Sequence, residues 1–387
     1  VENRIVFGEG LDILKNDCEI IEFVLDHCEI DVPDQNRFFI NVNYADIPCF
    51  VREKRMESLG ELVPSRLRQG IEALAYTGAC DYSHTTAEWE SVIKLGIYGV
   101  RNRVSEYAMS HSSNVNAMGF CEQILRVYNA ALRFMKRAAD TAALCGRTEM
   151  ASSLLRLTNH APSNLFEALQ TSIIYYHLQQ FFDGTYLRTL GRLDNLYYPY
   201  YARENKNEAD KLLLDYIKEI DRLKAPANIP FALGGTDENG ECLINELSYV
   251  WLDTYEKART TNTKLHILYS EHTPEDIIRK AFRYIRGGNN SIVFMSDRRV
   301  IEALEKQGVA HQDAVDYHVV GCYECGGAGE LTCSCNARVN IPKALELALN
   351  GGRDMLTGKL IGLESNCDFD TYEKLELEFE RQLRHMC

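Results

Sequence analysis

The sequence predicts an α/β protein in which helices alternate with short buried strands. Amphipathic stretches with apolar residues every three or four positions are separated by short apolar runs, such as 229–233 and 291–295. This alternation is typical of layered or barrel-shaped α/β folds. No internal repeat, low-complexity tract or flexible linker divides the 387 residues, so we expect one domain over residues 1–387.

Three helices are marked by local signals. Residues 116–144 form a long amphipathic segment that ends near Gly146, because glycine commonly follows a helix C-terminus. A second helix begins after Asn164, whose side chain can cap it while Glu167 reaches back. A third opens at 273–276, where a threonine cap precedes a proline and two acidic residues.

Buried strands are expected between these helices. The runs 229–233, 265–268 and 291–295 are short and apolar, and a pair of glycines follows the first of them. The first hundred residues are mixed, with runs such as 37–42 between acidic loops, and we assign them no architecture.

Composition excludes several classes of protein. The chain has 56 acidic against 42 basic residues, a formal charge of −14, and no long basic stripe, so nucleic acid and anionic membranes are excluded as partners. Its apolar runs are too short and too interrupted to span a bilayer. Thirteen cysteines in a chain with a sizeable core indicate a reducing cytoplasm rather than a disulfide scaffold. We therefore expect a cytoplasmic protein that acts on small molecules.

Both ends of the sequence suggest a longer polypeptide. The chain starts on Val1 rather than a methionine, and it stops at Cys387 inside a helical pattern that begins near residue 370. No glycine, asparagine or proline closes that pattern. We expect the chain to be part of a larger protein.

The stretch 318–330 contains the strongest candidates for catalytic residues. Cys322 and Glu324 lie two residues apart, after an apolar run and before three glycines. Glycine permits close backbone approach, so such a loop can lie deep in a fold. There Cys322 can serve as a nucleophile or redox centre, and Glu324 as a general base if burial raises its pKa.

The residues alone leave other interpretations open. Cys322 can be a buried structural cysteine beside a solvated glutamate. Cys322, Cys325, Cys333 and Cys335 run as C-x2-C-x7-C-x-C, which predicts a metal or redox site, although the second pair is closer than zinc or iron–sulfur knuckles require. The glycines at 326–329 can cradle a phosphate, but they lack the flanking pattern of known phosphate loops.

Five ordered motifs from about residue 80 to the end resemble the glycyl radical enzymes, the pyruvate formate-lyase-like family. The motifs are Ser83-His84-Thr85-Thr86 with the helical stretch 89–96; Leu190-Gly191-Arg192-Leu193-Asp194 with Pro199-Tyr200-Tyr201; Leu233-Gly234-Gly235; Asn245-Glu246-Leu247-Ser248-Tyr249; and Gly321-Cys322-Tyr323-Glu324. Five motifs in family order are far more specific than any one of them.

The resemblance implies a mechanism. In the family, a radical stored on a backbone glycine oxidises the loop cysteine to a thiyl radical, which takes a hydrogen atom from the substrate. By position, Cys322 would be the thiyl cysteine and Glu324 the general base. His84 matches a histidine that contacts substrate in several family dehydratases, and Thr189 and Asp194 flank the L-G-R-x-D element, so these three are the implied substrate-binding residues. For His84 and Asp194, purely structural roles remain equally open.

The resemblance also implies a fold, a radical and partners. The fold would be the family's ten-stranded α/β barrel, surrounded by helices, with the cysteine loop inside. This chain would be an incomplete barrel, since the glycyl loop of the family's C-terminal half is absent from residues 1–387. No directly bound cofactor or metal is implied. A radical S-adenosylmethionine activating enzyme would install the glycyl radical, and the protein would be an anaerobic homodimer whose present part is inactive alone.

The loop departs from the common family form G-C-V-E-P. Tyr323 and Cys325 replace the valine and proline, and residues 333–336 lack the aspartate that the diol dehydratases carry. The pattern around 324–329 and 340–343 is closer to the 4-hydroxyproline dehydratase branch. We expect a dehydratase, with a radical decarboxylase or a carbon–nitrogen or carbon–sulfur lyase as the alternative in the family, and a cysteine-cluster metal or redox protein as the alternative outside it.

Overall fold

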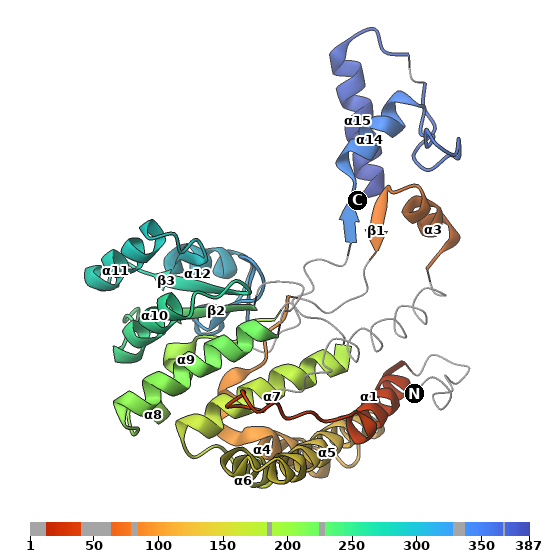
Figure 1. Ribbon diagram of the computed structural model, residues 1–387. Helices are drawn as coiled ribbons and strands as arrows, with labels where there is room; N and C mark the ends of the chain where they lie inside the picture. Colours follow the sequence, from red (N-terminus) through yellow and green to blue (C-terminus); the bar gives the residue numbers. More distant parts are fainter. Residues whose placement is uncertain are drawn as a thin grey trace. The chain divides into compact units, whose positions relative to one another are not determined.

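The computed structural model describes residues 13–39, 63–78, 84–183, 188–223, 229–327, 337–366 and 368–387. The chain divides into two compact units (Figure 1). Unit 1 comprises Val1–Arg52 and Tyr82–Thr332, and unit 2 comprises Glu53–Asp81 and Cys333–Cys387. No helix in the described ranges has both the length and the apolar character that crossing a membrane requires. A single domain over 1–387 stays a prediction.

The first part of unit 1 is a layer of packed helices (Figure 1). They are α1 (Ile13–His27), α4 (Trp89–Ser110), α5 (Val115–Leu144), α6 (Thr148–Leu157) and α7 (Leu165–Asp183). Helix α5 packs against α1, α4 and α6, and it buries alanines and aromatic residues such as Ala131 and Phe134. This helix confirms the amphipathic segment predicted over 116–144. The chain leaves it through Gly146, whose φ of +74° suits glycine.

Two helix starts differ in detail from the prediction. Asn164 does cap α7, accepting a hydrogen bond from the Glu167 N–H at 2.9 Å. The Glu167 carboxylate reaches back to the Ser163 N–H at 2.7 Å rather than to Asn164, because Arg156 holds the carboxylate from the other side. Helix α11 (Glu275–Arg286) begins after Pro274, and the expected cap, Thr273, instead accepts a bond from the Ser270 N–H.

Three parallel strands form the sheet of unit 1, in the order β2-β3-β4. They are β2 (Ile229–Gly234), β3 (Thr263–Tyr269) and β4 (Ile292–Ser296), and they confirm the three predicted runs. Helix α10 (Glu246–Ala258) connects β2 to β3, and α11 connects β3 to β4. Such helical crossovers are what parallel pairing requires.

The two faces of this sheet pack against different partners. Phe231 and Ile267 belong to a core shared with the helices. That core includes residues of α8 (Leu193–Tyr201), α9 (Lys206–Arg222), α10 and α11, as well as residues of α4 and α7. Ala232 and Leu268 belong to a separate core that includes Val319. Because successive residues of a strand point to opposite faces, the helices of the first core cover one face, and the other face packs against the segment around Val319 and against Ile301, Ala314 and Val315 of the two helices before it.

That segment is an antiparallel hairpin of β5 (Tyr317–Val319) and β6 (Cys325–Gly327), which follows α12 (Asp297–Lys306) and α13 (His311–Val315). The described residues form no closed barrel. Their sheets have three, two and two strands, whereas a closed barrel with a filled interior needs about eight. The expected part of a ten-stranded barrel, with the cysteine loop inside, stays a prediction.

Unit 2 is a small helical unit with one short strand pair. Its elements are α3 (Ser65–Glu72), β1 (Tyr76–Gly78), β7 (Ala337–Val339), α14 (Ile341–Leu349) and α15 (Tyr372–Met386). Strands β1 and β7 pair antiparallel. Helices α14 and α15 pack together around Leu347 and Met386. Helix α15 confirms the helical pattern predicted near the end of the chain.

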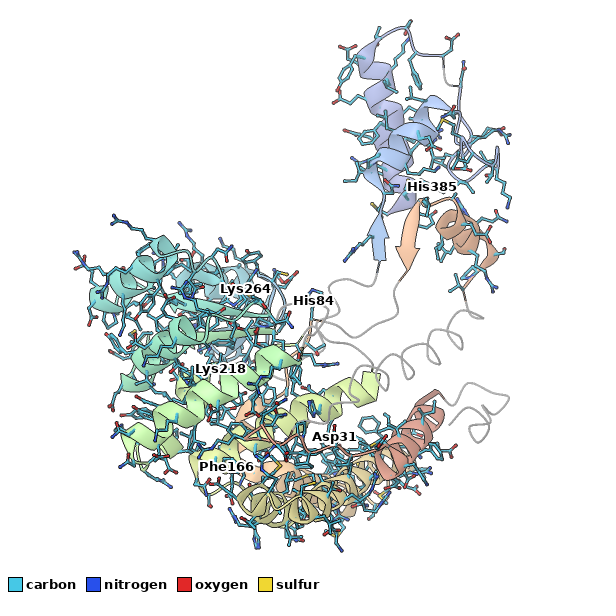
Figure 2. All side chains as sticks on the ribbon, in the orientation of Figure 1. Asp31, His84, Phe166, Lys218, Lys264 and His385 are labelled. Carbon is cyan, nitrogen blue, oxygen red and sulfur yellow. The ribbon has the colours of Figure 1, made fainter. Side chains whose placement is uncertain are left out.

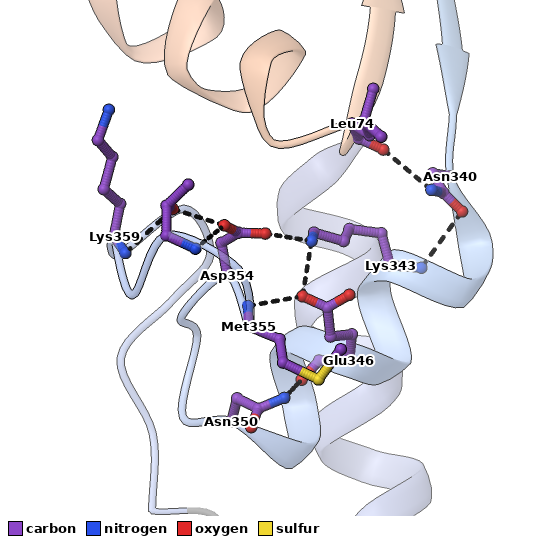
Figure 3. Close-up of polar contacts among 9 residues, drawn as sticks. Leu74, Asn340, Lys343, Glu346, Asn350, Asp354, Met355 and Lys359 are labelled. Carbon is purple, nitrogen blue, oxygen red and sulfur yellow. Dashed lines mark hydrogen bonds and ion pairs between the residues drawn. The ribbon is translucent and has the colours of Figure 1, made fainter.

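A buried lysine ties a loop to α14 in unit 2 (Figure 3). Lys343 is 6% exposed and forms ion pairs with Glu346, at 2.6 Å, and with Asp354. Asp354 also accepts hydrogen bonds from the backbone and hydroxyl of Thr357. The Lys343 bond, and then those of Thr357, lower the pKa of Asp354 to about 2. This network fixes the turn that follows α14.

Candidate active site

The β5–β6 hairpin carries Cys322 and Glu324 at its tip. Pairing runs from Tyr317 opposite Gly327 to Val319 opposite Cys325. The Val320 N–H donates to the Glu324 carbonyl at 2.8 Å and closes residues 321–324 into a tight loop. Cys322 is a free thiol of intermediate exposure. The structure therefore places the two predicted catalytic residues on one short, hydrogen-bonded loop.

The loop is anchored to the middle strand of the sheet. His266 on β3 is fully buried, and its Nε2 lies 2.9 Å from the Cys322 carbonyl oxygen. On the other side of the same peptide bond, the Tyr323 N–H donates to Glu324 Oε2 at 3.0 Å. His266 was not predicted from the sequence, since one histidine in an apolar run gives no signal of the residue it will contact.

Tyr323 lies over β3. Its ring is 6.2 Å from the His266 ring in an edge-on arrangement, and Lys264 Nζ lies 4.7 Å from the ring centre. Lys264 and His266 are two residues apart on β3, so their side chains point to the same face of the sheet. Figure 2 labels Lys264 and His84 in this part of unit 1. A large aromatic ring at the position of the family valine thus gives the loop a second contact with the strand.

His84 approaches the loop from the segment before α4. It is 7% exposed, and its Nε2 lies 3.8 Å from Glu324 Oε1, within ion-pair range when the ring is protonated. A Cβ atom on Gly321 would lie 2.2 Å from His84 Cδ2 and 2.4 Å from Glu324 Oε2. Only glycine at position 321 lets His84 and Glu324 come this close. The structure therefore brings together His84, Glu324 and the loop of Cys322.

The backbone of His84 is also unusual. Its φ of +60° lies in the left-handed region, which non-glycine residues rarely occupy. Such strain is retained where the surrounding structure enforces it, and it is common at functional sites. The conformation supports a functional position for this histidine.

The pKa of Glu324 is lowered, whereas the general-base role predicted from the sequence assumed that burial raises it. Burial disfavours the ionised form, but hydrogen bonds from backbone N–H groups, including that of Tyr323, and the charge of His84 outweigh it. The side chain is 37% exposed, so the burial that would raise the pKa is incomplete. Glu324 is therefore an ionised carboxylate at neutral pH.

Thr189 is buried beside the segment that carries His84. Its N–H donates to the Thr85 carbonyl at 3.3 Å, and its hydroxyl donates to the Pro230 carbonyl at 3.2 Å and accepts from the Gly191 N–H at 3.1 Å. These bonds join the chain before α8 to β2 and to the His84 segment. A substrate contact by Thr189 stays a prediction.

Asp194 is fully buried, and its carboxylate accepts hydrogen bonds from the sheet and from α10. One oxygen accepts from the Gly234 N–H at 2.8 Å and from the Ser248 hydroxyl, and the other from the Asn195 N–H at 3.0 Å. Burial raises its pKa to about 6 despite these donors. These contacts favour a supporting role for Asp194, and direct substrate binding stays a prediction.

Arg192 forms hydrogen bonds with the backbone at the start of the cysteine hairpin. Its Nη2 donates to the carbonyls of Val315 and Tyr317, at 2.5 and 2.8 Å, and the guanidinium lies over the Tyr317 ring. Gly235 leaves room for this side chain, since a Cβ there would lie 3.0 Å from Arg192 Nη1. The L-G-R and L-G-G motifs therefore meet behind the cysteine hairpin. The motifs pointed to both segments, but not to this contact.

The described residues do not assemble a metal site. No group of three or more histidine, cysteine or carboxylate side chains within them is placed to hold an ion. Cys325 has its pKa raised to about 12, by burial and then by the charge of Glu324, so it stays a thiol. Cys333 and Cys335, the other half of the predicted cysteine cluster, lie outside the described residues.

A family model described as pyruvate formate lyase-like matches residues 47–387. The trans-4-hydroxy-L-proline dehydratase of Clostridioides difficile is 29% identical over 51% of this chain and 28% of its own length. The (2S)-3-sulfopropanediol dehydratase of Klebsiella oxytoca is 27% identical over 62% of this chain and 32% of its own length. The chain thus aligns with only part of each relative.

The fold resembles that of a solved enzyme. The B12-independent glycerol dehydratase from Clostridium butyricum, in its glycerol-bound form, superposes with a TM-score of 0.82 at 17% identity. The match covers 98% of this chain and 59% of that one. At this identity the likeness concerns the fold, and it confirms the mixed α/β architecture.

Proposed function

Because the chain belongs to the pyruvate formate lyase-like family, we propose that it is the cysteine-loop part of a glycyl radical enzyme that eliminates water from a small hydroxylated substrate. The observation that carries the proposal is the meeting of His84 and Glu324 across Gly321, one residue from Cys322. Relatives that are dehydratases by name support the reaction class.

Cys322 is the proposed hydrogen-atom carrier. It is a free thiol on a loop held at both ends of its turn, and it is partly accessible to a small molecule. The glycyl radical expected on the remainder of the protein would supply the oxidising equivalent that turns this thiol into a thiyl radical. The sulfur then takes a hydrogen atom from a substrate C–H bond, which regenerates the thiol and leaves a carbon radical.

Glu324 is the proposed base for the next step. An O–H or N–H group on a radical carbon is far more acidic than in the parent molecule, so an ionised carboxylate with a lowered pKa suffices to accept its proton. The neighbouring carbon–oxygen bond then breaks, and the leaving hydroxide takes up a proton and departs as water. The product radical recovers a hydrogen atom from Cys322, so atoms, protons and electrons balance.

His84 is proposed to contact the leaving hydroxyl. Its Nε2 lies 3.8 Å from Glu324, so the proton taken by the carboxylate can pass to the leaving group directly or through the imidazole. Thr189 and Asp194 complete the proposed substrate-binding set. Their buried hydrogen bonds support a role in holding the strand ends beside the substrate.

The proposal includes partners. A radical S-adenosylmethionine activating enzyme would install the radical, and the whole protein would be a cytoplasmic homodimer of an anaerobic organism. The chain spans 59% of the glycerol dehydratase chain that it resembles. The part described by residues 1–387 is therefore proposed to be inactive alone.

The test uses the activated full-length protein under anaerobic conditions, with trans-4-hydroxy-L-proline, (2S)-3-sulfopropanediol and glycerol as candidate substrates. Cys322→Ala should abolish turnover, and Glu324→Gln should lower kcat by about 100-fold or more. Cys325→Ala is the matched control, because the mechanism leaves that thiol unused. Turnover by Cys322→Ala would refute the assignment.

Product analysis separates the related reactions. Loss of water supports a dehydratase, whereas release of carbon dioxide, an amine or sulfite would assign the decarboxylase or lyase alternative. Metal analysis addresses the alternative outside the family. Stoichiometric zinc or iron that is lost in Cys322→Ala would favour a cysteine-cluster protein over a thiyl enzyme.

A further inference from the structure

The peptide bond between Cys322 and Tyr323 is held on both of its edges. Its carbonyl oxygen lies 2.9 Å from His266 Nε2, and its N–H donates to Glu324 Oε2 at 3.0 Å. In a trans peptide the C=O and N–H point to opposite sides of one rigid plane. Two contacts on opposite edges therefore fix the rotation of that plane.

His266 is itself a rigid anchor. It lies on the middle strand of the sheet, paired with Ala232 of β2 and Val293 of β4. Its side chain is fully buried, and the Tyr323 ring packs edge-on against it. The sheet therefore determines where the His266 ring can lie, and the loop adapts to it.

The proton on His266 can be assigned from its partner. A carbonyl oxygen only accepts hydrogen bonds, so Nε2 must carry the hydrogen. Burial lowers the pKa of His266 and keeps the ring neutral, although the backbone groups of Cys322 and Phe231 act in the opposite direction. A neutral imidazole has one N–H, and in this arrangement it is directed at Cys322.

We propose that His266 is a positioning residue for the cysteine loop, whose Nε2–H sets the Cys322–Tyr323 peptide plane and thereby aims both the Cys322 side chain and the Tyr323 N–H that Glu324 accepts. The proposal rests on the function proposed above for Cys322 and Glu324. Donation to a carbonyl polarises the peptide and strengthens its N–H as a donor, so His266 also acts on the Glu324 carboxylate through the backbone.

Few charged groups face this arrangement. His84 faces Glu324 from the segment before α4, at 3.8 Å. Lys264, on the same strand as His266, lies over the Tyr323 ring. The contact with the Cys322 carbonyl comes from His266, so a change at that peptide when His266 is replaced reports on the imidazole.

The sequence makes this one peptide directly observable. Cys322-Tyr323 is the only Cys-Tyr pair in the chain. Within residues 1–387, labelling with carbonyl-¹³C cysteine and ¹⁵N tyrosine therefore gives one carbonyl–amide correlation in the NMR spectrum, from this bond alone. The carbonyl shift reports the His266 bond, and the pH dependence of the amide proton shift reports Glu324.

Two amide variants form a matched pair. Glutamine places its amide nitrogen near the position of the histidine Nε2, and asparagine places its own near Nδ1. His266→Gln should keep the carbonyl shift close to that of the unmodified protein. His266→Asn should move the carbonyl resonance upfield and move the Glu324 titration to higher pH, toward the ordinary glutamate value. Equal spectra for the two variants would overturn the proposal.

A third variant controls for general loss of packing. His177→Gln removes another buried histidine of the same unit, which lies on α7 rather than on the sheet or the hairpin. It should leave the Cys322–Tyr323 correlation unchanged. Should either His266 variant fail to fold, the tautomer of His266 in the unmodified protein decides, because ¹⁵N shifts showing hydrogen on Nδ1 and none on Nε2 would overturn the proposal.

Activity gives the functional half of the test. In the activated full-length protein, His266→Asn should lower kcat by about 100-fold, because a displacement of the reacting group by about 1 Å has that cost. KM should stay within about twofold, and the acid limb of the pH profile should move to higher pH. His266→Gln should retain most of the activity, and equal loss in both variants would count against positioning.

The NMR and activity measurements test the positioning role of His266 and the proposed reaction separately. The NMR comparison uses unactivated protein and does not depend on any radical. If the correlation responds as expected while no variant or unmodified protein turns over substrate, the positioning contact stands and the proposed reaction fails. If turnover depends on Cys322 but the Cys322–Tyr323 correlation is the same in both His266 variants, the proposed reaction stands and the positioning role fails.

Discussion

The Arg192 guanidinium donates to the backbone carbonyl of Tyr317 at 2.8 Å and also lies over the ring of the same residue. Arg192 comes from the chain just before α8, and Tyr317 begins the strand that leads to Cys322. Both residues are buried. One side chain thus fixes the start of the hairpin on which the candidate site is built.

Removing this side chain should loosen the hairpin. Arg192→Met leaves the Val315 and Tyr317 carbonyls without their donor, and we expect a loss of about 3 kcal/mol in the free energy of unfolding. Urea unfolding followed by the fluorescence of Trp89 and Trp251 measures it. Arg298→Met, at an exposed arginine of α12, is the control and should change stability by about 0.5 kcal/mol or less. Equal losses in both variants would contradict the assigned role.

Gly321 should tolerate no side chain. Gly321→Ala would place a Cβ 2.2 Å from His84 and 2.4 Å from Glu324, so one of them must move. We expect turnover of the activated protein to fall by about 100-fold, since the catalytic groups are displaced. Gly119→Ala on α5 meets no atom within 4 Å and should leave turnover unchanged. Full activity of Gly321→Ala would show that His84 and Glu324 need not be this close.

Glu219 should make stability depend on pH. Its carboxylate accepts the N–H groups of Arg37 and Phe38, and burial raises its pKa to about 7. The folded state therefore holds a proton that the unfolded state has released between about pH 4.5 and 7, so this group makes the protein less stable as pH rises through that window.

The variant Glu219→Gln removes the titration. The free energy of unfolding of the unmodified chain, relative to that of the variant, should fall by on the order of 3 kcal/mol between pH 5 and pH 8. Urea unfolding at the two pH values gives the difference. Glu208→Gln, at an exposed residue of the same helix, should show no such fall. A difference that rises with pH would contradict the raised pKa.

The Lys343 network should stabilise unit 2. Asp354→Asn leaves the buried ammonium of Lys343 with Glu346 alone, and we expect a loss of about 3 kcal/mol in local stability. Because the pKa of Asp354 is lowered to about 2, its contribution is complete above the ordinary aspartate pKa and is lost as pH falls toward 2.

Hydrogen exchange of the α14 and α15 amides, followed by mass spectrometry, measures this change within unit 2 at neutral pH. Asp370→Asn is the matched control, because it breaks an exposed pair with Lys374 on α15 that should contribute about 0.5 kcal/mol or less. Faster exchange in Asp354→Asn alone is the expected result. Equal protection in both variants would mean that the buried pair does not hold the loop.

The sequence by itself determined the elements that depend on local chemistry. Helices α5 and α15 and strands β2, β3 and β4 follow from the spacing of apolar residues, and the cysteine loop follows from its glycines and motif. The predictions of helix starts were less accurate, because the side chains of Glu167 and Thr273 form hydrogen bonds with other residues than the expected cap partners.

Only the tertiary structure decided the contacts around the loop. His266, Arg192 and His84 reach it from distant parts of the chain, and no spacing rule predicts which of them meet. The same packing reversed the expected direction for Glu324, since its pKa depends on how many N–H donors and charges surround it and on how much water remains. The residue types of the loop suggested its chemistry. The residues that pack against the hairpin determine the geometry of the loop and the ionisation of Glu324.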